Sequence, residues 1–458
     1  MVYTTVLAAL SLLALTADAA PHTGSSVSHL ARHTLQNRDV DLKVTTWKPT
    51  AFTQPRTPAK SPHVMSLKKL ATNHANTRSA AYLKGLTGRW LGYGEDQLIS
   101  LIEGQEYATS IMFGTQSFDV IVDTGSSDTW VVKEGFECIN LATGKKTTEA
   151  ECKFGSTYSV DWGFEKIPGE FFNITYGDGE YLHGYMGTEI ITLANVMVET
   201  EVAVVTGAAW EGDGTTSGLT GLAFPALTSA YSSKTDKQKE YNPIFTTMYE
   251  EGLVEPYFSL AILRDTSGEA GYLTLGGLPP IDFTETWTTT DILITSITGY
   301  PATYDFYTIN IDGVTLNGET ISGAGGDIQY IIDSGTTLNY YPTSVANAVN
   351  AAFDPPAVYN TTQGAYVVDC NAKPPAHAIT IAGTTFTINP LDMILNGGTD
   401  ANGKTFCISG IDDGGNDPSA DLYILGDTFQ KNVVTVFDVG AAQLMFAPHE
   451  DYTSNDTY

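Results

Sequence analysis

Two aspartates, each in the same short motif, are the residues of this sequence best suited to do chemistry. Asp123 opens an Asp-Thr-Gly triplet and Asp333 opens an Asp-Ser-Gly triplet, each behind an apolar β-branched run and ahead of two hydroxyl residues. Such a run predicts a buried strand that ends in a tight turn carrying one carboxylate. Two carboxylates brought together would share one proton and could act as a general acid–base pair.

The turns themselves need glycine, and Gly125 and Gly335 complete the two triplets. Glycine lets the chain turn sharply and leaves backbone N–H groups free to point at the carboxylate. A second apolar match containing glycine follows each triplet, at residues 218–222 and 423–427. Because the offset is 333 − 123 = 210 for the aspartates and 426 − 221 = 205 for the second glycines, the pattern predicts two copies of one lobe.

These segments resemble those of the pepsin-type aspartic endopeptidases, and the resemblance spans about residues 103–448. Residues 123–130 are similar to the family's first active-site segment and residues 174–179 to its flap hairpin. Residues 424–429, followed by 436–438, are similar to its C-terminal segment. The resemblance implies an all-β, bilobal pepsin-like fold, with two pseudo-symmetric β-barrel-like lobes, a cleft between them and a flap hairpin.

The resemblance also implies roles for single residues. Asp123 and Asp333 would be the catalytic dyad that activates a water molecule, and the mechanism needs no cofactor and no metal ion. Supporting roles fall to Thr124, Ser126, Trp130 and Ser334. Substrate-binding roles fall to Gly125, Tyr176, Gly177, Asp178, Leu219, Gly335 and Thr336. Trp130 is the expected hydrogen-bond partner of the flap residue Tyr176.

Asp178 departs from the family pattern, which often has a neutral hydroxyl residue at this position of the flap. A carboxylate over the first specificity pocket could pair with a lysine of the substrate. We therefore expect broad specificity with an apolar preference, together with acceptance of lysine at P1.

Length and composition fit a large, turn-rich β protein. The chain has 458 residues, 44 of them glycine, and only 16% are charged. Short helices are predicted near residues 243–251 and 344–352, and strands elsewhere. We divide the chain into a signal peptide (1–19), a basic propeptide (20–90), an N-terminal lobe (91–286) and a C-terminal lobe (287–458).

The charge changes sign along the chain. Residues 20–90 contain eleven Lys/Arg and two acids (+9), whereas residues 91–458 contain twelve and forty-nine (−37). A basic leader on an acidic body is typical of a zymogen whose propeptide inhibits the enzyme until carboxylates protonate. The family places a propeptide lysine against the dyad, and Lys68, Lys69 and Lys84 are the candidates. The alternative is a basic tail that binds an anionic partner. The acidic body would repel nucleic acid.

The N-terminal nineteen residues have an apolar run and a small-residue cleavage site at 17–19, as secretory signals do. We expect a secreted, extracellular monomer without a membrane anchor, with a vacuolar lumen as the alternative location. Its partners would be protein and peptide substrates, and its own propeptide as an intramolecular inhibitor.

Export also favours disulfides and glycans. Four cysteines allow three pairings, and the local one, Cys138–Cys152 with Cys370–Cys407, keeps each bridge within one lobe and fits the family. Glycosylation sequons begin at Asn173, Asn360 and Asn455.

Two alternatives come from other functional classes. A non-catalytic binding protein or inhibitor could have the same fold, but such proteins usually lose a catalytic Asp or a flanking Gly. A glycosidase could use Asp123 and Asp333 as its acid and its nucleophile or base. That alternative leaves the duplicated turns and the flap hairpin unexplained. The Asp/Gly-rich stretches 397–404 and 412–417 are predicted to be hairpin turns rather than calcium loops.

Overall fold

The computed structural model describes residues 64–69, 99–101, 106–160, 163–176, 179–235, 237–264, 268–284, 286–295, 302–361, 363–399, 405–416 and 423–449. For residues 64–69 and 99–101 the description covers the backbone alone. The predicted signal peptide, the side chains of Lys68 and Lys69, and the whole of Lys84, Gly177, Asp178 and Asn455 lie outside the described part.

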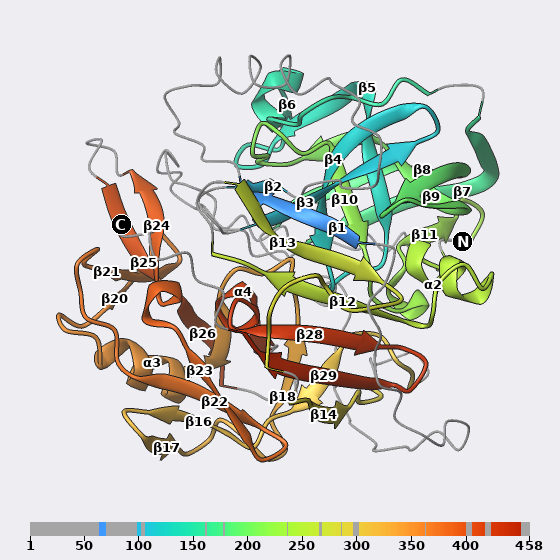
Figure 1. Cartoon of the computed structure of the whole chain (residues 1–458). Helices are drawn as coiled ribbons and strands as arrows, with labels where there is room; N and C mark the ends of the chain where they lie inside the picture. Colours follow the sequence, from blue (N-terminus) through green and yellow to red (C-terminus); the bar gives the residue numbers. More distant parts are fainter. Residues whose placement is uncertain are drawn as a thin grey trace, which may run out of the picture.

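The first half of the chain forms a ten-stranded sheet in the order β11-β7-β8-β9-β5-β10-β4-β3-β2, with β6 paired to β5 (Figure 1). The strands are β2 (Ile99–Leu101), β3 (Glu106–Phe113), β4 (Gln116–Asp123), β5 (Thr129–Asn140), β6 (Lys145–Lys146), β7 (Glu165–Thr175), β8 (Tyr181–Leu193), β9 (Val196–Ala209), β10 (Gly218–Gly221) and β11 (Ala230–Ser232). Most are rich in the β-branched residues that pack well in a pleated sheet.

The second half forms three smaller sheets, ordered β15-β18-β27-β19-β26, β17-β16-β22-β23 and β20-β21-β25-β24. Their strands are β15 (Thr308–Asn310), β16 (Gly313–Leu316), β17 (Glu319–Ile321), β18 (Gln329–Ile332), β19 (Asn339–Pro342), β20 (Val358–Asn360), β21 (Ala365–Val368), β22 (His377–Ile381), β23 (Thr384–Ile388), β24 (Ile394–Thr399), β25 (Thr405–Ser409), β26 (Ile411–Gly415) and β27 (Tyr423–Leu425).

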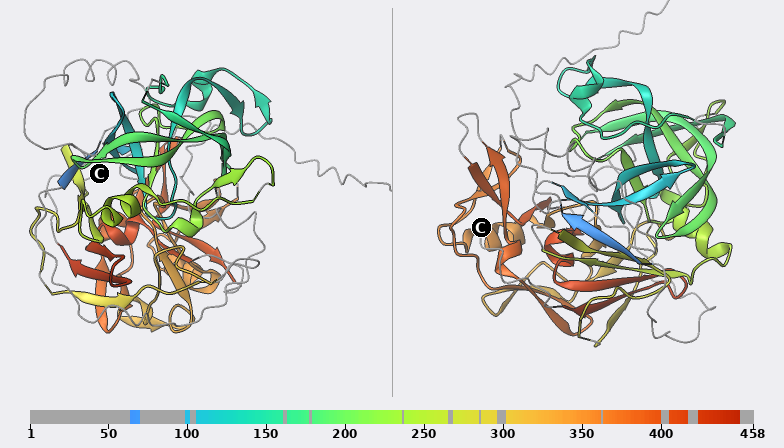
Figure 2. Two further views of the ribbon diagram at one scale, coloured as in Figure 1. Left: turned by 90° about the vertical axis from the view of Figure 1, so that its right-hand side faces the viewer. Right: turned by 45° about the horizontal axis from the view of Figure 1, so that its top comes forward.

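A six-stranded sheet joins the two halves in the order β1-β13-β12-β28-β29-β14. Its strands are β1 (Val64–Lys69), β12 (Tyr257–Ile262), β13 (Gly268–Leu275), β14 (Thr288–Asp291), β28 (Val433–Asp438) and β29 (Gln443–Pro448). β1 comes from the basic leader and runs antiparallel to β13, beside which it lies in both views of Figure 2. The predicted bilobal all-β fold is confirmed.

The predicted internal repeat is visible in the strand pairing. β10 lies parallel to β4 and ends with Gly221 beside Asp123. In the second half, β27 lies parallel to β18 in the same way and ends with Leu425 beside Ile332. The two sequence matches that follow the triplets are therefore the strands that support the two aspartate turns.

Helices are few and short in the part of the chain that the structure describes. They are the α-helices α2 (Ile244–Glu250), α3 (Thr343–Ala351) and α4 (Asp427–Gln430), and the 3-10 helices η2 (Glu149–Cys152), η3 (Pro225–Leu227) and η4 (Pro390–Asp392). The helices predicted near residues 243–251 and 344–352 are confirmed as α2 and α3. Within the described residues, none of the helices has the length and apolar character needed to cross a membrane.

One hydrophobic core runs through both halves, from Tyr107 to Phe446. At the joint, the rings of Phe258 and Phe437 stack with centroids 4.6 Å apart, and Tyr307 meets Phe437 at 4.7 Å. Burying a side chain of this size stabilises the fold by about 1.5–3 kcal/mol. The described cysteines form the predicted pairs Cys138–Cys152 and Cys370–Cys407.

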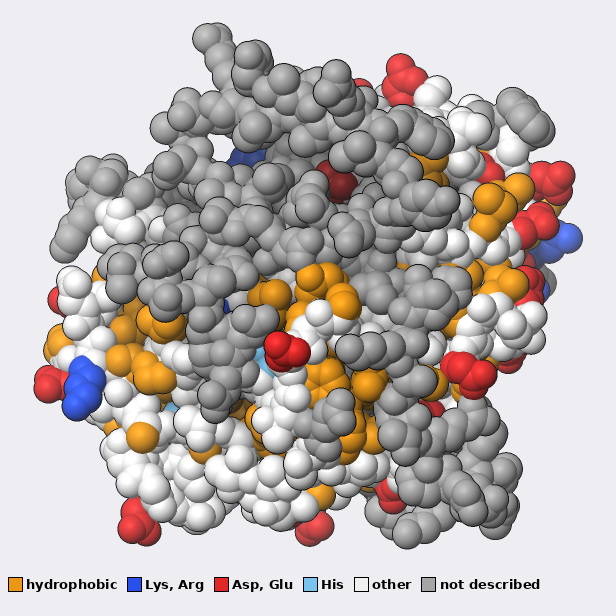
Figure 3. Space-filling view, viewed as in Figure 1, with side chains coloured by type: hydrophobic (Ala, Val, Ile, Leu, Met, Phe, Trp, Pro, Cys, Tyr) orange, Lys and Arg blue, Asp and Glu red, His pale blue; other side chains and the backbone are white. Residues whose placement is uncertain are grey.

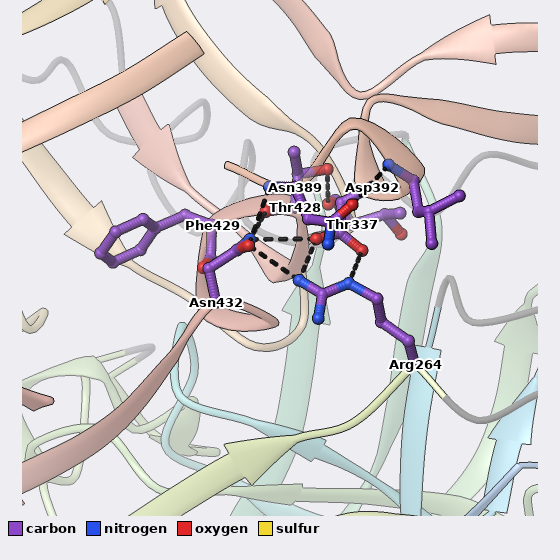
Figure 4. Close-up of polar contacts among 8 residues, drawn as sticks. Arg264, Thr337, Asn389, Asp392, Thr428, Phe429 and Asn432 are labelled. Carbon is purple, nitrogen blue, oxygen red and sulfur yellow. Dashed lines mark hydrogen bonds and ion pairs between the residues drawn. The ribbon is translucent and has the colours of Figure 1, made fainter. Parts of the chain in front are cut away.

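A buried polar cluster also crosses the joint (Figure 4). The Arg264 guanidinium follows β12 and binds the Asp392 carboxylate of η4 through two nitrogens. It also donates to the Asn432 side-chain oxygen at 2.8 Å, and the amide nitrogen of Asn432 donates to Asp392 at 3.0 Å. The side chains of Arg264 and Asp392 are only 9% and 2% exposed. The ion pair is therefore desolvated as well as hydrogen-bonded.

We expect Asp392→Ala to lower the free energy of unfolding by about 3–5 kcal/mol, because it leaves the buried Arg264 charge unpaired. The double variant Arg264→Met/Asp392→Leu should recover most of that loss, because both charges are then absent. Urea unfolding measures both values. Equal destabilisation in the single and double variants would show that packing, not charge pairing, explains the effect.

Candidate active site

Each active-site turn hydrogen-bonds its own carboxylate. The Gly125 N–H donates to Asp123 at 2.7 Å, and the Ser126 hydroxyl donates to the other carboxylate oxygen. In the second turn, the backbone N–H of Gly335 donates to Asp333 at 2.8 Å and the Thr336 hydroxyl donates at 2.7 Å. Thr336, predicted to bind substrate, thus occupies the position that Ser126 occupies in the first turn.

The two turns also hydrogen-bond one another. The Ser334 N–H donates to the Thr124 hydroxyl at 2.9 Å, and the Thr124 N–H donates to the Ser334 hydroxyl at 3.2 Å. The Thr124 hydroxyl donates to the Ile332 carbonyl at 3.0 Å, and the Ser334 hydroxyl donates to the Val122 carbonyl at 2.9 Å. All four contacts are buried, so the separation of the turns is fixed from both sides.

This arrangement places each aspartate against the opposite glycine. A Cβ atom added to Gly125 would lie 2.5–2.7 Å from the Asp333 carboxyl atoms, and one added to Gly335 would collide with Asp123. Any side chain at either position would push the carboxylates apart. The glycines are thus required for the close approach as well as for the turn.

The electrostatics of the pair follow from burial and proximity. Asp123 is 2% exposed and Asp333 is fully buried. Burial raises the pKa of Asp333 well above its usual value, and the nearby charge of Asp123 raises it further. Burial also raises the pKa of Asp123, although hydrogen bonds from Ser126 and Gly125 oppose the shift. Burial and proximity therefore both favour retention of a proton by the pair at a pH where two isolated carboxyls would both be ionised.

Tyr176 directly follows β7, at the start of the hairpin that leads to β8. Its N–H donates to the Glu180 carbonyl at 2.7 Å. The expected hydrogen bond is present, since the Trp130 indole N–H donates to the Tyr176 hydroxyl at 2.9 Å. Leu219 of β10 is paired with Trp130 of the adjoining strand β5 and is fully buried in the same hydrophobic cluster as Tyr176. Within the described residues, no group of three His, Cys, Asp or Glu side chains could hold a metal ion.

Asp427 is a third buried carboxyl near the dyad that the sequence did not single out. Its N–H donates to the Thr336 carbonyl at 2.9 Å, but among the residues that the structure describes neither carboxyl oxygen has a hydrogen-bond partner. Burial raises its pKa well above the usual value, the Lys431 charge opposes this shift, and the charges of Asp333, Glu106 and Asp123 add to it. Asp427 lies in the matched segment 424–429, but nothing local in the sequence indicated that its carboxyl would be buried near the dyad.

This chain is similar to known aspartic proteases over most of its length. A family model described as eukaryotic aspartyl protease matches residues 106–449. A probable aspartic-type endopeptidase of Aspergillus fumigatus is 52% identical over 415 residues, covering 90% of this chain and 93% of that protein. Penicillopepsin-1 of Penicillium janthinellum is 26% identical over 347 residues, covering 75% of this chain and 95% of that protein.

The aspartic proteinase of Irpex lacteus has a crystal structure that matches with a TM-score of 0.60 at 18% identity, covering 79% of this chain and 99% of that chain. Two β lobes that each supply one aspartate to a common site are the architecture of aspartic endopeptidases. This chain belongs to the eukaryotic aspartyl protease family. It is an aspartic-type endopeptidase of the EC 3.4.23 class, and its substrates are proteins and peptides.

Membership of this family removes the glycosidase alternative. The non-catalytic alternative is also disfavoured, because both triplets are intact and each carboxylate lies against the glycine of the opposite turn. Asp427, which the sequence did not single out, interacts with the dyad through tertiary proximity rather than through a motif.

The raised pKa of Asp427 predicts a pH effect on stability. A carboxyl whose folded pKa is raised adds stability that is present below its unfolded value, about 4, and is lost as pH rises through the folded pKa. Because asparagine cannot ionise, the Tm of Asp427→Asn should fall less than that of the wild type between about pH 4 and 7. Asp282→Asn, at an exposed position, is the control, and parallel decline in all three proteins would contradict the prediction.

Proposed function

We propose that this chain is a secreted, acid-activated zymogen whose mature form hydrolyses peptide bonds with a water molecule held between Asp123 and Asp333. The observation that carries the proposal is the placement of each carboxylate against the glycine of the opposite turn. A shared proton then leaves one carboxylate ionised as a base and the other protonated as an acid.

In the proposed reaction, the ionised carboxylate takes a proton from the water while the oxygen attacks the scissile carbonyl carbon. The protonated carboxyl donates its proton to the carbonyl oxygen, which gives a neutral gem-diol. Collapse of the gem-diol breaks the C–N bond, with a proton passing to the leaving amine, and the dyad returns to its one-proton state. Sharing of one proton between two carboxyls that cannot both ionise is general among aspartic proteases.

The other residues have supporting roles in this proposal. Thr124 and Ser334 brace the two turns, Ser126 and Thr336 orient the carboxylates, and Trp130 holds Tyr176. The groups proposed to contact an extended peptide come from the two turns, the hairpin and strand β10. They are Gly125, Gly335, Thr336, Tyr176, Gly177, Asp178 and Leu219.

Two features of the leader support the zymogen proposal, its positive charge and the strand β1 that it contributes to a sheet. The basic segment 20–90 contains β1, in which Lys68 pairs in register with Glu269 of β13. Figure 3 shows acidic side chains at many points of the described surface, as expected for a body that a cationic propeptide would bind. Lys68, Lys69 and Lys84 are the candidates for the lysine that pairs with the dyad. Acid would release the propeptide by protonating carboxylates.

We further propose the division into residues 1–19, 20–90, 91–286 and 287–458 as signal peptide, propeptide and two lobes. The mature protein would be an extracellular monomer, with a vacuolar lumen as the alternative location. Asn173 on β7 and Asn360 on β20 are exposed and accessible to glycosylation. Asn455 remains a sequon predicted from the sequence alone.

Hydrolysis of denatured haemoglobin or casein, measured between about pH 2.5 and 7 with the acid-treated protein, tests the dyad. We expect activity mainly at about pH 3–5, inhibition by pepstatin, and a loss in kcat/KM of at least about 10²-fold in Asp123→Asn and in Asp333→Asn. Asp327→Asn, at an exposed position, should remain active. Undiminished activity in a folded dyad variant would overturn the proposal.

Specificity for lysine at P1 is tested with two peptides that differ only in having Lys or Phe at P1. Asp178→Thr should reduce kcat/KM for the Lys peptide by roughly tenfold or more, because a hydrogen bond to a charged group is worth about 1.5–3 kcal/mol. The Phe peptide is the control and should be cleaved as before. An unchanged Lys-to-Phe ratio in the variant would rule out this role for Asp178.

A further inference from the structure

A cluster of aromatic rings connects Tyr176 to the segment that follows the first disulfide. We call Phe154, Trp210, Trp130 and Tyr176 the aromatic cluster. The rings of Phe154 and Trp210 stack 5.8 Å apart with an interplanar angle of 11°. Trp210 makes edge contacts with Tyr176 at 5.7 Å and with Trp130 at 5.4 Å. The Phe154 ring also meets the Trp130 ring edge-on at 6.1 Å. Trp210 and Trp130 therefore both join Phe154 to the tyrosine of the hairpin.

Backbone hydrogen bonds fix the segments that carry Phe154 and Trp210. The Gly212 N–H donates to the Cys152 carbonyl at 3.0 Å, and the Gly214 N–H donates to the Lys153 carbonyl at 2.7 Å. The Gly155 N–H donates to the Thr216 carbonyl, also at 2.7 Å. Residues 152–155 and 210–216 thus form one unit, and the Cys138–Cys152 disulfide attaches this unit to the end of β5.

The same unit also holds the other side of the hairpin. The Glu180 carboxylate is buried and accepts a hydrogen bond from the Glu211 N–H at 2.6 Å. Glu180 in turn accepts the Tyr176 N–H through its backbone carbonyl at 2.7 Å. The hairpin is therefore connected to residues 210–216 twice, by the Trp210–Tyr176 ring contact and by the Glu180 carboxylate.

We propose that Phe154 is a positioning residue for Tyr176, acting through its stack on Trp210 and its edge contact with Trp130. The stack with Phe154 restricts the orientation of the Trp210 ring, whose edge contact sets where the Tyr176 ring lies. Tyr176 is fully buried and shares its hydrogen bond with Trp130, so a displaced Trp210 ring would affect both partners. The inference rests on the proposed function, in which Tyr176 contacts the substrate.

A double-mutant cycle in kcat/KM tests this coupling. Phe154→Leu should lower kcat/KM by about twofold to tenfold, in keeping with the modest strength of single aromatic contacts. In the Tyr176→Leu background the same substitution should cause little further loss. Equal losses in both backgrounds would overturn the proposal.

Phe164→Leu is the matched control, because Phe164 is also half-buried in the first lobe but packs on Tyr158 and Tyr185. We expect it to leave kcat/KM unchanged, and a loss equal to that of Phe154→Leu would contradict a specific role for Phe154. If Phe154→Leu does not fold, Phe154→Met takes its place in the same cycle.

Hydrogen exchange separates failure of this inference from failure of the proposed function. Amides of residues 171–184 should exchange faster in Phe154→Leu than in the wild type or in Phe164→Leu, whether or not the protein is catalytic. Unchanged exchange in Phe154→Leu would overturn the positioning role. A wild-type protein without peptidase activity would contradict the proposed function, and the exchange result would still decide the role of Phe154.

Discussion

The hydrogen bonds that cross between the two active-site turns are the contacts on which the rest of this structure depends. Thr124 and Ser334 donate to and accept from one another, and each hydroxyl also reaches the strand that leads to the opposite aspartate. The six-stranded sheet joins the lobes, and these four buried hydrogen bonds join the two turns directly. They hold Asp123 and Asp333 in one site.

The cost of this arrangement is the burial of charge. Removing a carboxylate from water is unfavourable unless it is paired or hydrogen-bonded, and each turn offsets part of the cost with one backbone and one hydroxyl donor. The part of the burial cost that these hydrogen bonds do not offset raises the pKa values of both aspartates. Asp427 is a further carboxyl buried at the same joint, and its pKa is also raised. A joint that holds several buried carboxyls is best suited to acid, where some are neutral.

The sequence predicted the parts of the site that short motifs specify. The aspartate turns, the helices α2 and α3, both disulfides and the Trp130–Tyr176 hydrogen bond follow from local patterns or from the family resemblance. It did not predict the burial of the Asp427 carboxyl near the dyad or the stack of Phe154 on Trp210. Both depend on which distant segments pack together, and hydrophobic periodicity carries no information about that choice.

The central claim is that the two aspartates share one proton, and infrared spectroscopy of the carboxyl region across pH tests it most directly. The difference between the wild type and Asp123→Asn should contain a protonated carboxyl that persists well above the ordinary carboxyl pKa of about 4. In the variant, the Asp333 carboxyl should ionise at lower pH, because its charged neighbour is gone. Two carboxyls that ionise together near pH 4 in the wild type would contradict the account.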